Sequence, residues 1–197
     1  MNILAFDLGS EFTGVAYMES GSLQWSTTWE LVAKRIESPE LRWMRFEKNL
    51  SGLIVKDRLR IDLVAFEEVR SHRNPKGGYN TTAAHQYGGC RAILIKWCGD
   101  RLGKPFVSVT VQEIKTAATG KGGGKGTSKE DVLKAAKARW PKLGIAGYDA
   151  ADAAFIAVCA HESYSPDGGW RAGDTATQSA AAGKAVGKGF LTGGRYV

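Results

Sequence analysis

Acidic side chains occur at three places where apolar segments of the chain end or begin. They are Asp7, which follows the apolar residues 3–6; Glu67 and Glu68, in IDLVAFEEV; and Asp149 and Asp152, in GYDAADAAFIAV. A charge at the end of a buried strand is costly unless it meets a partner or a metal. Ligands collect at the carboxyl ends of strands in open α/β sheets. Asp7 is therefore a candidate metal ligand, although aspartate also begins many ordinary turns.

Spacing decides how these carboxylates can meet. Asp149 and Asp152 are three residues apart, which places them on one helix face, about 5–6 Å apart at Cβ. Like charges on one face repel unless a cation lies between them, but acids are also favoured at a helix N-terminus. Neighbouring parallel strands lie about 4.8 Å apart, so Asp7 could stand beside one of the two glutamates. Because successive side chains of a strand point to opposite faces, only one of the two glutamates can face Asp7, and this alternation does not show whether it is Glu67 or Glu68. Oxygen-only ligands suit Mg²⁺ or Mn²⁺ rather than zinc.

The first half of the chain supplies the elements that would position these residues. Apolar stretches at 2–8, 13–19 and 22–29 predict three strands, with Ser20-Gly21-Ser22 as a hairpin turn. Short turns make them an antiparallel meander. Ser38-Pro39-Glu40 predicts a helix start with Pro39 at its first position, and apolar residues then recur at helical spacing to about residue 56. A buried strand at 61–69 follows, parallel to the first strand because a helix connects the two.

The second half predicts mostly helices. A basic loop at 70–79 precedes a long helix that Asn80 or Thr81 caps and that continues to about Leu102. A short strand at 106–109 and a short helix at 111–118 lead into a Gly/Lys loop at 119–127. Ser128 and Asp131 resemble a capping box for a helix that Pro141 stops, and the last helix covers 149–163. Residues 164–197 are rich in Gly, Ala and Ser, so we expect a basic tail that follows a folded domain at 1–163.

Composition limits the classes of protein to consider. The chain has 197 residues and a formal net charge of +7, which favours a polyanionic partner such as nucleic acid. No apolar run is long enough to span a membrane, and no basic segment with a cleavage site precedes the first strand, so we expect a cytoplasmic protein. The three cysteines form no CxxC pair and no zinc site. Cys90 and Cys98 would lie about 12 Å apart on one helix, too far for a disulfide, so we expect reduced thiols.

Four motifs together resemble the RuvC family of Holliday junction resolvases, within the RNase H-like superfamily. They are FDLGSEFTG, VAFEEV, VQEIKTAATGKG followed by SKEDV, and YDAADAAFIA, and they cover roughly residues 1–162. The resemblance implies an RNase H-like α/β fold: a five-stranded mixed sheet, part antiparallel meander and part parallel, flanked by helices. It matches Asp7 to the family's first acid, Glu67 rather than Glu68 to the second, and Asp149 and Asp152 to the final pair.

The resemblance also implies how DNA would be held. Lys115 and Lys129 match family lysines near the scissile phosphate and the DNA backbone, although the loop between them is longer and richer in glycine here. The family's aromatic junction contact falls on Arg70, so that contact is either displaced to Tyr79 or absent. The predicted phosphate-holding residues are basic and lie mostly in loops: Arg70, Arg73, Lys76, Lys115, Lys121, Lys125 and Lys129. The long Gly/Lys loop and the tail resemble a phage or mobile-element relative, which would place the protein in host cytoplasm.

The activity implied is a structure-selective endodeoxyribonuclease that resolves four-way or branched DNA. Two Mg²⁺ ions (or Mn²⁺) would lie about 3.5–4 Å apart, bridged by Asp7 and flanked by the other acids. Two symmetric nicks favour a homodimer, with the helix at 80–102 (Tyr87, Ile95, Trp97) as a candidate interface unless those residues are core. Lys125-Gly126 breaks the Walker A pattern, and the isolated His72, His85 and His161 are expected to be structural or at the surface.

Three other classes of protein share part of this pattern. Actin-like and sugar-kinase ATPases also open on a strand that ends in Asp-Leu-Gly, but they need two such domains. A RuvC-like nuclease that processes ribosomal RNA precursors remains an alternative, although it is usually shorter and has no such tail. A non-catalytic junction-binding protein is the third, and the intact set of acids argues against it.

Overall fold

A computed structural model describes residues 1–34, 36–55, 59–69, 78–120, 126–165 and 169–170. The core is one five-stranded sheet in the order β3-β2-β1-β4-β5. Its strands are β1 (Asn2–Asp7), β2 (Phe12–Glu19), β3 (Ser22–Glu30), β4 (Leu63–Glu68) and β5 (Phe106–Thr110). The first three form an antiparallel meander, whereas β4 runs parallel to β1 and to β5. The predicted five-stranded mixed sheet is confirmed.

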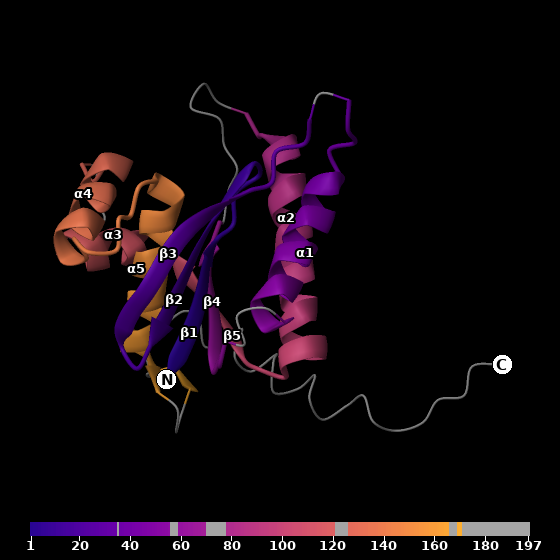
Figure 1. The fold of residues 1–197 in the computed structure, drawn as a ribbon. Coiled ribbons are helices and arrows are strands. Elements are labelled where there is room, and N and C mark those ends of the chain that lie inside the picture. The colour runs from indigo at the N-terminus through magenta and orange to yellow at the C-terminus, as the bar shows by residue number, and fades with distance from the viewer. Residues whose placement is uncertain (35, 56–58, 70–77, 121–125, 166–168, 171–197) are drawn as a thin grey trace.

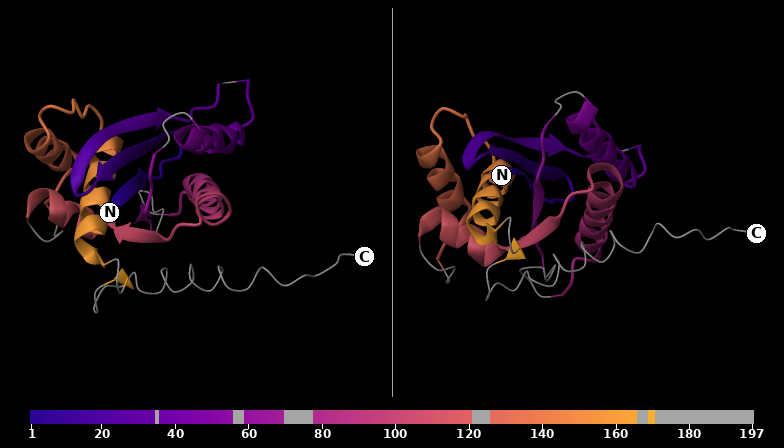
Figure 2. Two further views of the ribbon diagram at one scale, coloured as in Figure 1. Left: turned by 60° about the horizontal axis from the view of Figure 1, so that its bottom comes forward. Right: turned by 90° about the horizontal axis from the view of Figure 1, so that it is seen from below.

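Helices cover both faces of this sheet (Figure 1). One face carries α1 (Leu41–Val55) and α2 (Thr81–Trp97), and α2 continues as a π-helical turn, Cys98–Leu102. The other carries α5 (Tyr148–Ser163), with α3 (Val111–Thr119) and α4 (Lys129–Arg139) beside it (Figure 2). A two-residue ladder, β6 (Tyr164–Ser165) with β7 (Gly169–Trp170), follows α5.

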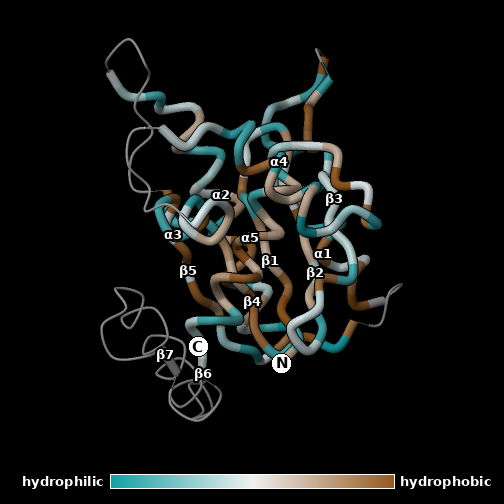
Figure 3. Tube along the Cα trace, turned by 90° about the vertical axis from the view of Figure 1, so that its left-hand side faces the viewer, coloured by the Kyte–Doolittle hydropathy of each residue, from teal (hydrophilic) through white to brown (hydrophobic). Residues whose placement is uncertain are grey.

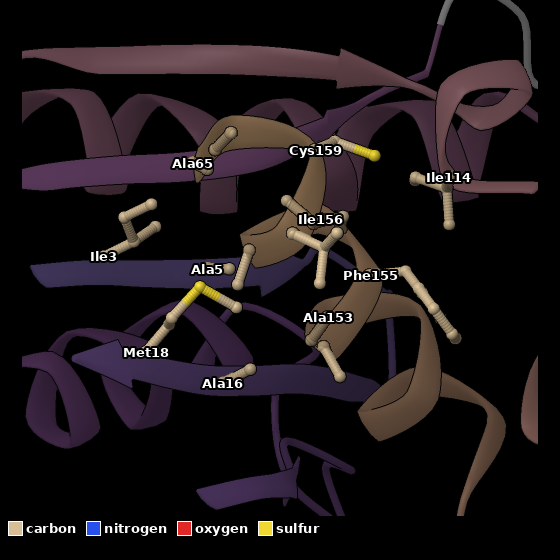
Figure 4. Packing of buried hydrophobic residues seen from close by; sticks show 14 of the residues in the cluster. Ile3, Ala5, Ala16, Met18, Ala65, Ile114, Ala153, Phe155, Ile156 and Cys159 are labelled. Atoms are coloured by element: carbon tan, nitrogen blue, oxygen red, sulfur yellow. The ribbon is translucent and has the colours of Figure 1, made fainter. Parts of the chain in front are cut away.

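Strand alternation divides the interior into two cores. Odd-numbered side chains of β1 and β4, such as Ile3, Ala5 and Ala65, pack on α5, as the close view in Figure 4 shows. Even-numbered ones, such as Leu4 and Phe66, pack on α1 and α2. Because both faces are covered, the strands β1, β4 and β5 appear as largely apolar segments in Figure 3. The alanines of α5 are buried and let the helix lie close to the sheet; they are Ala150, Ala151, Ala153, Ala154, Ala157 and Ala160.

Local signals in the sequence explain most element boundaries. Asn80 Oδ1 accepts a hydrogen bond from Ala83 N at 3.0 Å and caps α2. Ser128 and Asp131 form the predicted capping box of α4. Ser20 and Gly21 both have positive φ, 49° and 83°, as a tight two-residue hairpin turn requires. The first core-facing helix begins at Leu41, two residues later than predicted, because Pro39 and Glu40 form an entry turn with i to i+3 hydrogen bonds.

Other predictions have mixed outcomes. Tyr87 and Trp97, proposed for a subunit interface, are buried in the core of their own chain, so α2 does not offer these two side chains to a partner. The three cysteines are unpaired and buried, as predicted. No helix among the described residues is long and apolar enough to cross a lipid bilayer. Most of the predicted tail, 171–197, lies outside the described residues.

Candidate active site

Asp7 and Glu67 lie at the carboxyl ends of two neighbouring central strands, β1 and β4. The β1–β4 register pairs Phe6 with Phe66, and the next position on each strand carries the carboxylate. Asp7 is buried, with 8% of its surface exposed, and its carboxyl is hydrogen-bonded to that of Glu67. The sequence-based expectation that strand ends bring these two acids together is met.

The alternation of side chains decides which glutamate faces the cluster. Ala65 packs on the α5 side of the sheet, so Glu67, two residues further, shares that side with Asp7. Phe66 packs on the α1 and α2 side, and Glu68 shares that opposite side. The structure therefore separates two adjacent carboxylates that the sequence period could not distinguish.

Asp149 and Asp152 reach the same end of the sheet because α5 begins there (Figure 1). Gly14 makes this approach possible. It pairs with Asp7 across β1 and β2, and a Cβ atom at Gly14 would lie 1.9 Å from the Asp149 carbonyl oxygen. The backbone of the first turn of α5 therefore lies directly on β2, beside Asp7.

Strand β3 holds the same turn from the other side. Ser26 Oγ donates a hydrogen bond to the Ala150 carbonyl at 2.6 Å, and a Cβ at Gly147 would lie 3.4 Å from Thr28 Oγ1. In the sequence, the one feature that could have indicated these contacts is Gly14, because a glycine inside a strand often marks a close approach of another backbone segment. Gly14, Ser26 and Gly147 are thus site-building residues that the sequence patterns did not identify.

Burial and like charges act on the acids together. Burial raises the pKa of Asp7 well above its usual range, and the hydrogen bond and charge of Glu67 raise it further. The charges of Asp152 and Asp149 act in the same direction. Asp7 therefore lies within electrostatic reach of the other three acids.

Asp152 links the acids to two lysines. Burial raises the pKa of Asp152 to about 6, against the opposing charge of Lys129. Glu67 and Asp149 raise it as well, and Lys115 lowers it. Lys115 lies on α3 and Lys129 is the first residue of α4, so both helices place a cation beside the carboxylates.

The donor set fits a hard divalent cation. Carboxylate oxygens are the preferred ligands of Mg²⁺ and Mn²⁺, and a buried group of like charges is costly without a counter-ion. Among the described residues, no three acidic, His or Cys side chains are arranged as a ready-made metal site.

The remaining predicted DNA contacts are only partly described. Tyr79 is exposed, with 68% of its surface accessible, just before the N-cap of α2. The others, namely Arg70, Arg73, Lys76, Lys121 and Lys125, lie outside the described residues. Their roles stay predictions.

Comparison with known proteins gives no match in sequence but clear matches in structure. No family model and no curated protein sequence matches the chain. Thermus thermophilus RuvC in complex with a Holliday junction substrate has a TM-score of 0.62 and 18% identity, covering 82% of this chain and 92% of that chain. A second T. thermophilus RuvC structure has a TM-score of 0.61 and 19% identity, covering 82% and 93%.

The yeast mitochondrial Holliday junction resolvase Ydc2 is also similar, with a TM-score of 0.53 and 13% identity, covering 80% of this chain and 76% of that chain. The similarity extends over most of each molecule. The chain therefore has the RNase H-like fold of the RuvC Holliday junction resolvases, and the resemblance carried by its four motifs is confirmed at the level of fold.

Proposed function

We propose that the protein is a divalent-metal-dependent endonuclease that cuts four-way or otherwise branched DNA. The observation that carries this proposal is the convergence of four acids at the carboxyl ends of the central strands: Asp7, Glu67, Asp149 and Asp152. The similarity of the fold to that of junction resolvases favours DNA as the substrate, and the net charge of +7 favours a polyanion.

Each residue has a proposed role in this reaction. Two Mg²⁺ or Mn²⁺ ions, when bound, would supply a nucleophilic water and neutralise charge on the scissile phosphate. Asp7, Glu67, Asp149 and Asp152 would hold these ions through their carboxylate oxygens. Lys115 and Lys129 would hold the phosphate at the edge of the cluster, where both already act on Asp152.

Other residues would hold the branched substrate away from the cluster. Contacts from basic side chains to DNA phosphates give affinity that depends on salt and not on sequence. The predicted contacts are Arg70, Arg73, Lys76, Lys121 and Lys125, with Tyr79 as the candidate aromatic contact. Selectivity would then come from the shape of the junction.

The decisive experiment is Asp7→Asn. Asparagine keeps the size of the side chain but removes a charge that a metal would need, so cleavage of a four-way junction in Mg²⁺ should fall below detection. Junction affinity, measured by gel shift in EDTA, should not weaken. Normal cleavage by this variant would refute the metal-site assignment.

A substrate panel separates the alternatives. The wild-type protein should cut a four-way junction in preference to duplex, single-stranded and flap DNA and to structured RNA. Preference for RNA would favour the RNA-processing alternative, and tight junction binding without any cleavage would favour a non-catalytic binding protein.

A further inference from the structure

Tyr87 is a buried tyrosine whose hydroxyl contacts the strand end that carries Glu67. Only 7% of its surface is exposed, and its side chain packs between α2 and the face of the sheet opposite α5. Its hydroxyl donates a hydrogen bond to the Glu67 carbonyl at 2.8 Å and accepts one from Val69 N at 3.3 Å. One side-chain oxygen thus connects the backbone on both sides of Glu68.

These two backbone groups lie where the sheet no longer provides partners. Val64 N donates to the Pro105 carbonyl on the β5 side, so alternation turns the backbone groups of Glu67 and Val69 toward β1. The pairing of β1 with β4 ends at Phe6 and Phe66, and β1 itself ends at Asp7. The Tyr87 hydroxyl therefore occupies the place of a missing strand neighbour. A buried backbone group left without a partner would be destabilising.

We infer that Tyr87 is a positioning residue for the Glu67 carboxylate; this inference rests on the proposed function. Glu67 is the last residue but one of β4, where rotation of the backbone would swing its side chain away from Asp7. The hydroxyl fixes that rotation from the face opposite the cluster. Phenylalanine at this position keeps the ring and its packing but loses both hydrogen bonds.

The chain offers a matched control in Tyr17. This residue is also a buried tyrosine, 5% exposed, and its hydroxyl donates to the Arg60 carbonyl at 3.0 Å. Arg60 precedes β4, at the end of that strand away from Glu67. Tyr17→Phe therefore removes a comparable hydrogen bond at the far end of the same sheet.

The test compares Tyr87→Phe and Tyr17→Phe in the full chain. Amide hydrogen exchange at Val69 should accelerate at least about tenfold in Tyr87→Phe alone, because its N–H loses the acceptor. Calorimetric Mn²⁺ affinity should weaken about tenfold, as for other residues that orient a ligand. The Mg²⁺ concentration for half-maximal junction cleavage should rise by the same factor, while junction affinity in EDTA stays within about twofold.

The outcomes separate this inference from the function on which it rests. If Tyr87→Phe matches Tyr17→Phe in Mn²⁺ affinity and Mg²⁺ requirement, the positioning role is wrong, even where both variants lose stability. If the wild type binds Mn²⁺ but cuts no junction, the proposed function fails, whereas weaker Mn²⁺ binding by Tyr87→Phe would still support positioning. If the wild type binds no Mn²⁺, both are overturned.

Discussion

Asp152 carries a proton in the metal-free protein more readily than an ordinary aspartate does. Burial, Glu67 and Asp149 raise its pKa to about 6 from a usual value of 3.8. The native state therefore binds a proton that the unfolded chain releases at a lower pH. By linkage, the stability contributed by this group is complete below about pH 4 and is lost as pH rises through about 6.

This difference predicts a pH-dependent effect of Asp152→Asn. In EDTA at pH 7.5, the free energy of unfolding of the variant should exceed that of the wild type by up to about 3 kcal/mol. Asparagine cannot ionise, so the cost of ionising Asp152 in the folded protein, about two pKa units at ~1.4 kcal/mol each, disappears. At pH 4 the gain should disappear. Urea unfolding at several pH values measures it, and a gain that does not change with pH would contradict the assignment. Mg²⁺ should stabilise the wild type more than the variant.

The two adjacent glutamates provide a second prediction at this scale. Glu67 lies on the α5 side of β4 with Asp7, and Glu68 lies on the opposite side. Glu67→Gln should therefore reduce junction cleavage by at least about a hundredfold in Mg²⁺, the upper range for lost metal-site interactions, whereas Glu68→Gln should stay within a few-fold of wild type. Single-turnover rates with saturating protein measure both. Equal losses in the two variants would show that the strand face does not decide the ligand.

At the scale of elements, the site depends on how closely α5 approaches the sheet. The first turn of α5 lies on Gly14, where a Cβ atom would come within 1.9 Å of the Asp149 carbonyl oxygen, so there is no room for a side chain. Ser26 fixes the next carbonyl of the helix with a 2.6 Å hydrogen bond. Backbone contacts of the first turn of α5 thus help to position its acids.

Gly14→Ala should accordingly damage both stability and activity. The added methyl would push the N-terminal turn of α5 away from β2, costing about 1–3 kcal/mol of unfolding free energy. Cleavage should fall by up to about a hundredfold, since small displacements of catalytic groups have such effects. Chemical unfolding and single-turnover cleavage measure the two losses.

Gly88→Ala is the matched control, because Gly88 lies within α2 and a Cβ there would meet nothing within 4 Å. Alanine should stabilise that helix by about 0.5–1 kcal/mol and leave cleavage unchanged. If Gly14→Ala cleaves as well as Gly88→Ala, the position of α5 does not depend on this contact.

The elements and most of the acids could be predicted from the sequence, because buried runs that end in carboxylates and acids three residues apart are local patterns. Strand alternation alone could not choose between Glu67 and Glu68, because the choice depends on which face α5 covers; only the resemblance to the RuvC family favoured Glu67. The roles of Gly14 and Tyr87 were also hidden, since both arise from contacts between segments far apart in the chain. The position of Tyr87 in the apolar pattern of its helix suits a residue that packs in the core and equally one that contacts a partner subunit. Only the tertiary packing shows that Tyr87 belongs to the core.

At the scale of the whole molecule, the four acids of the candidate site form a single cluster at the carboxyl ends of the two central strands β1 and β4. Resolving a four-way junction needs two symmetric cuts, so we propose that two chains act together on one junction. A twofold dimer would present two equivalent sites to the two strands. This arrangement makes the number of active sites in each complex measurable from the product.

A cruciform plasmid distinguishes paired cuts from single ones. Wild-type protein should convert it mainly to linear DNA, because both sites cut before the complex dissociates. Adding Asp7→Asn protein in increasing excess should replace linear product with nicked circles, since mixed dimers carry one competent site. Bovine serum albumin in equal amounts is the control for dilution. A monomer acting alone would instead give nicked circles at every ratio, and the inactive variant would lower only the overall rate.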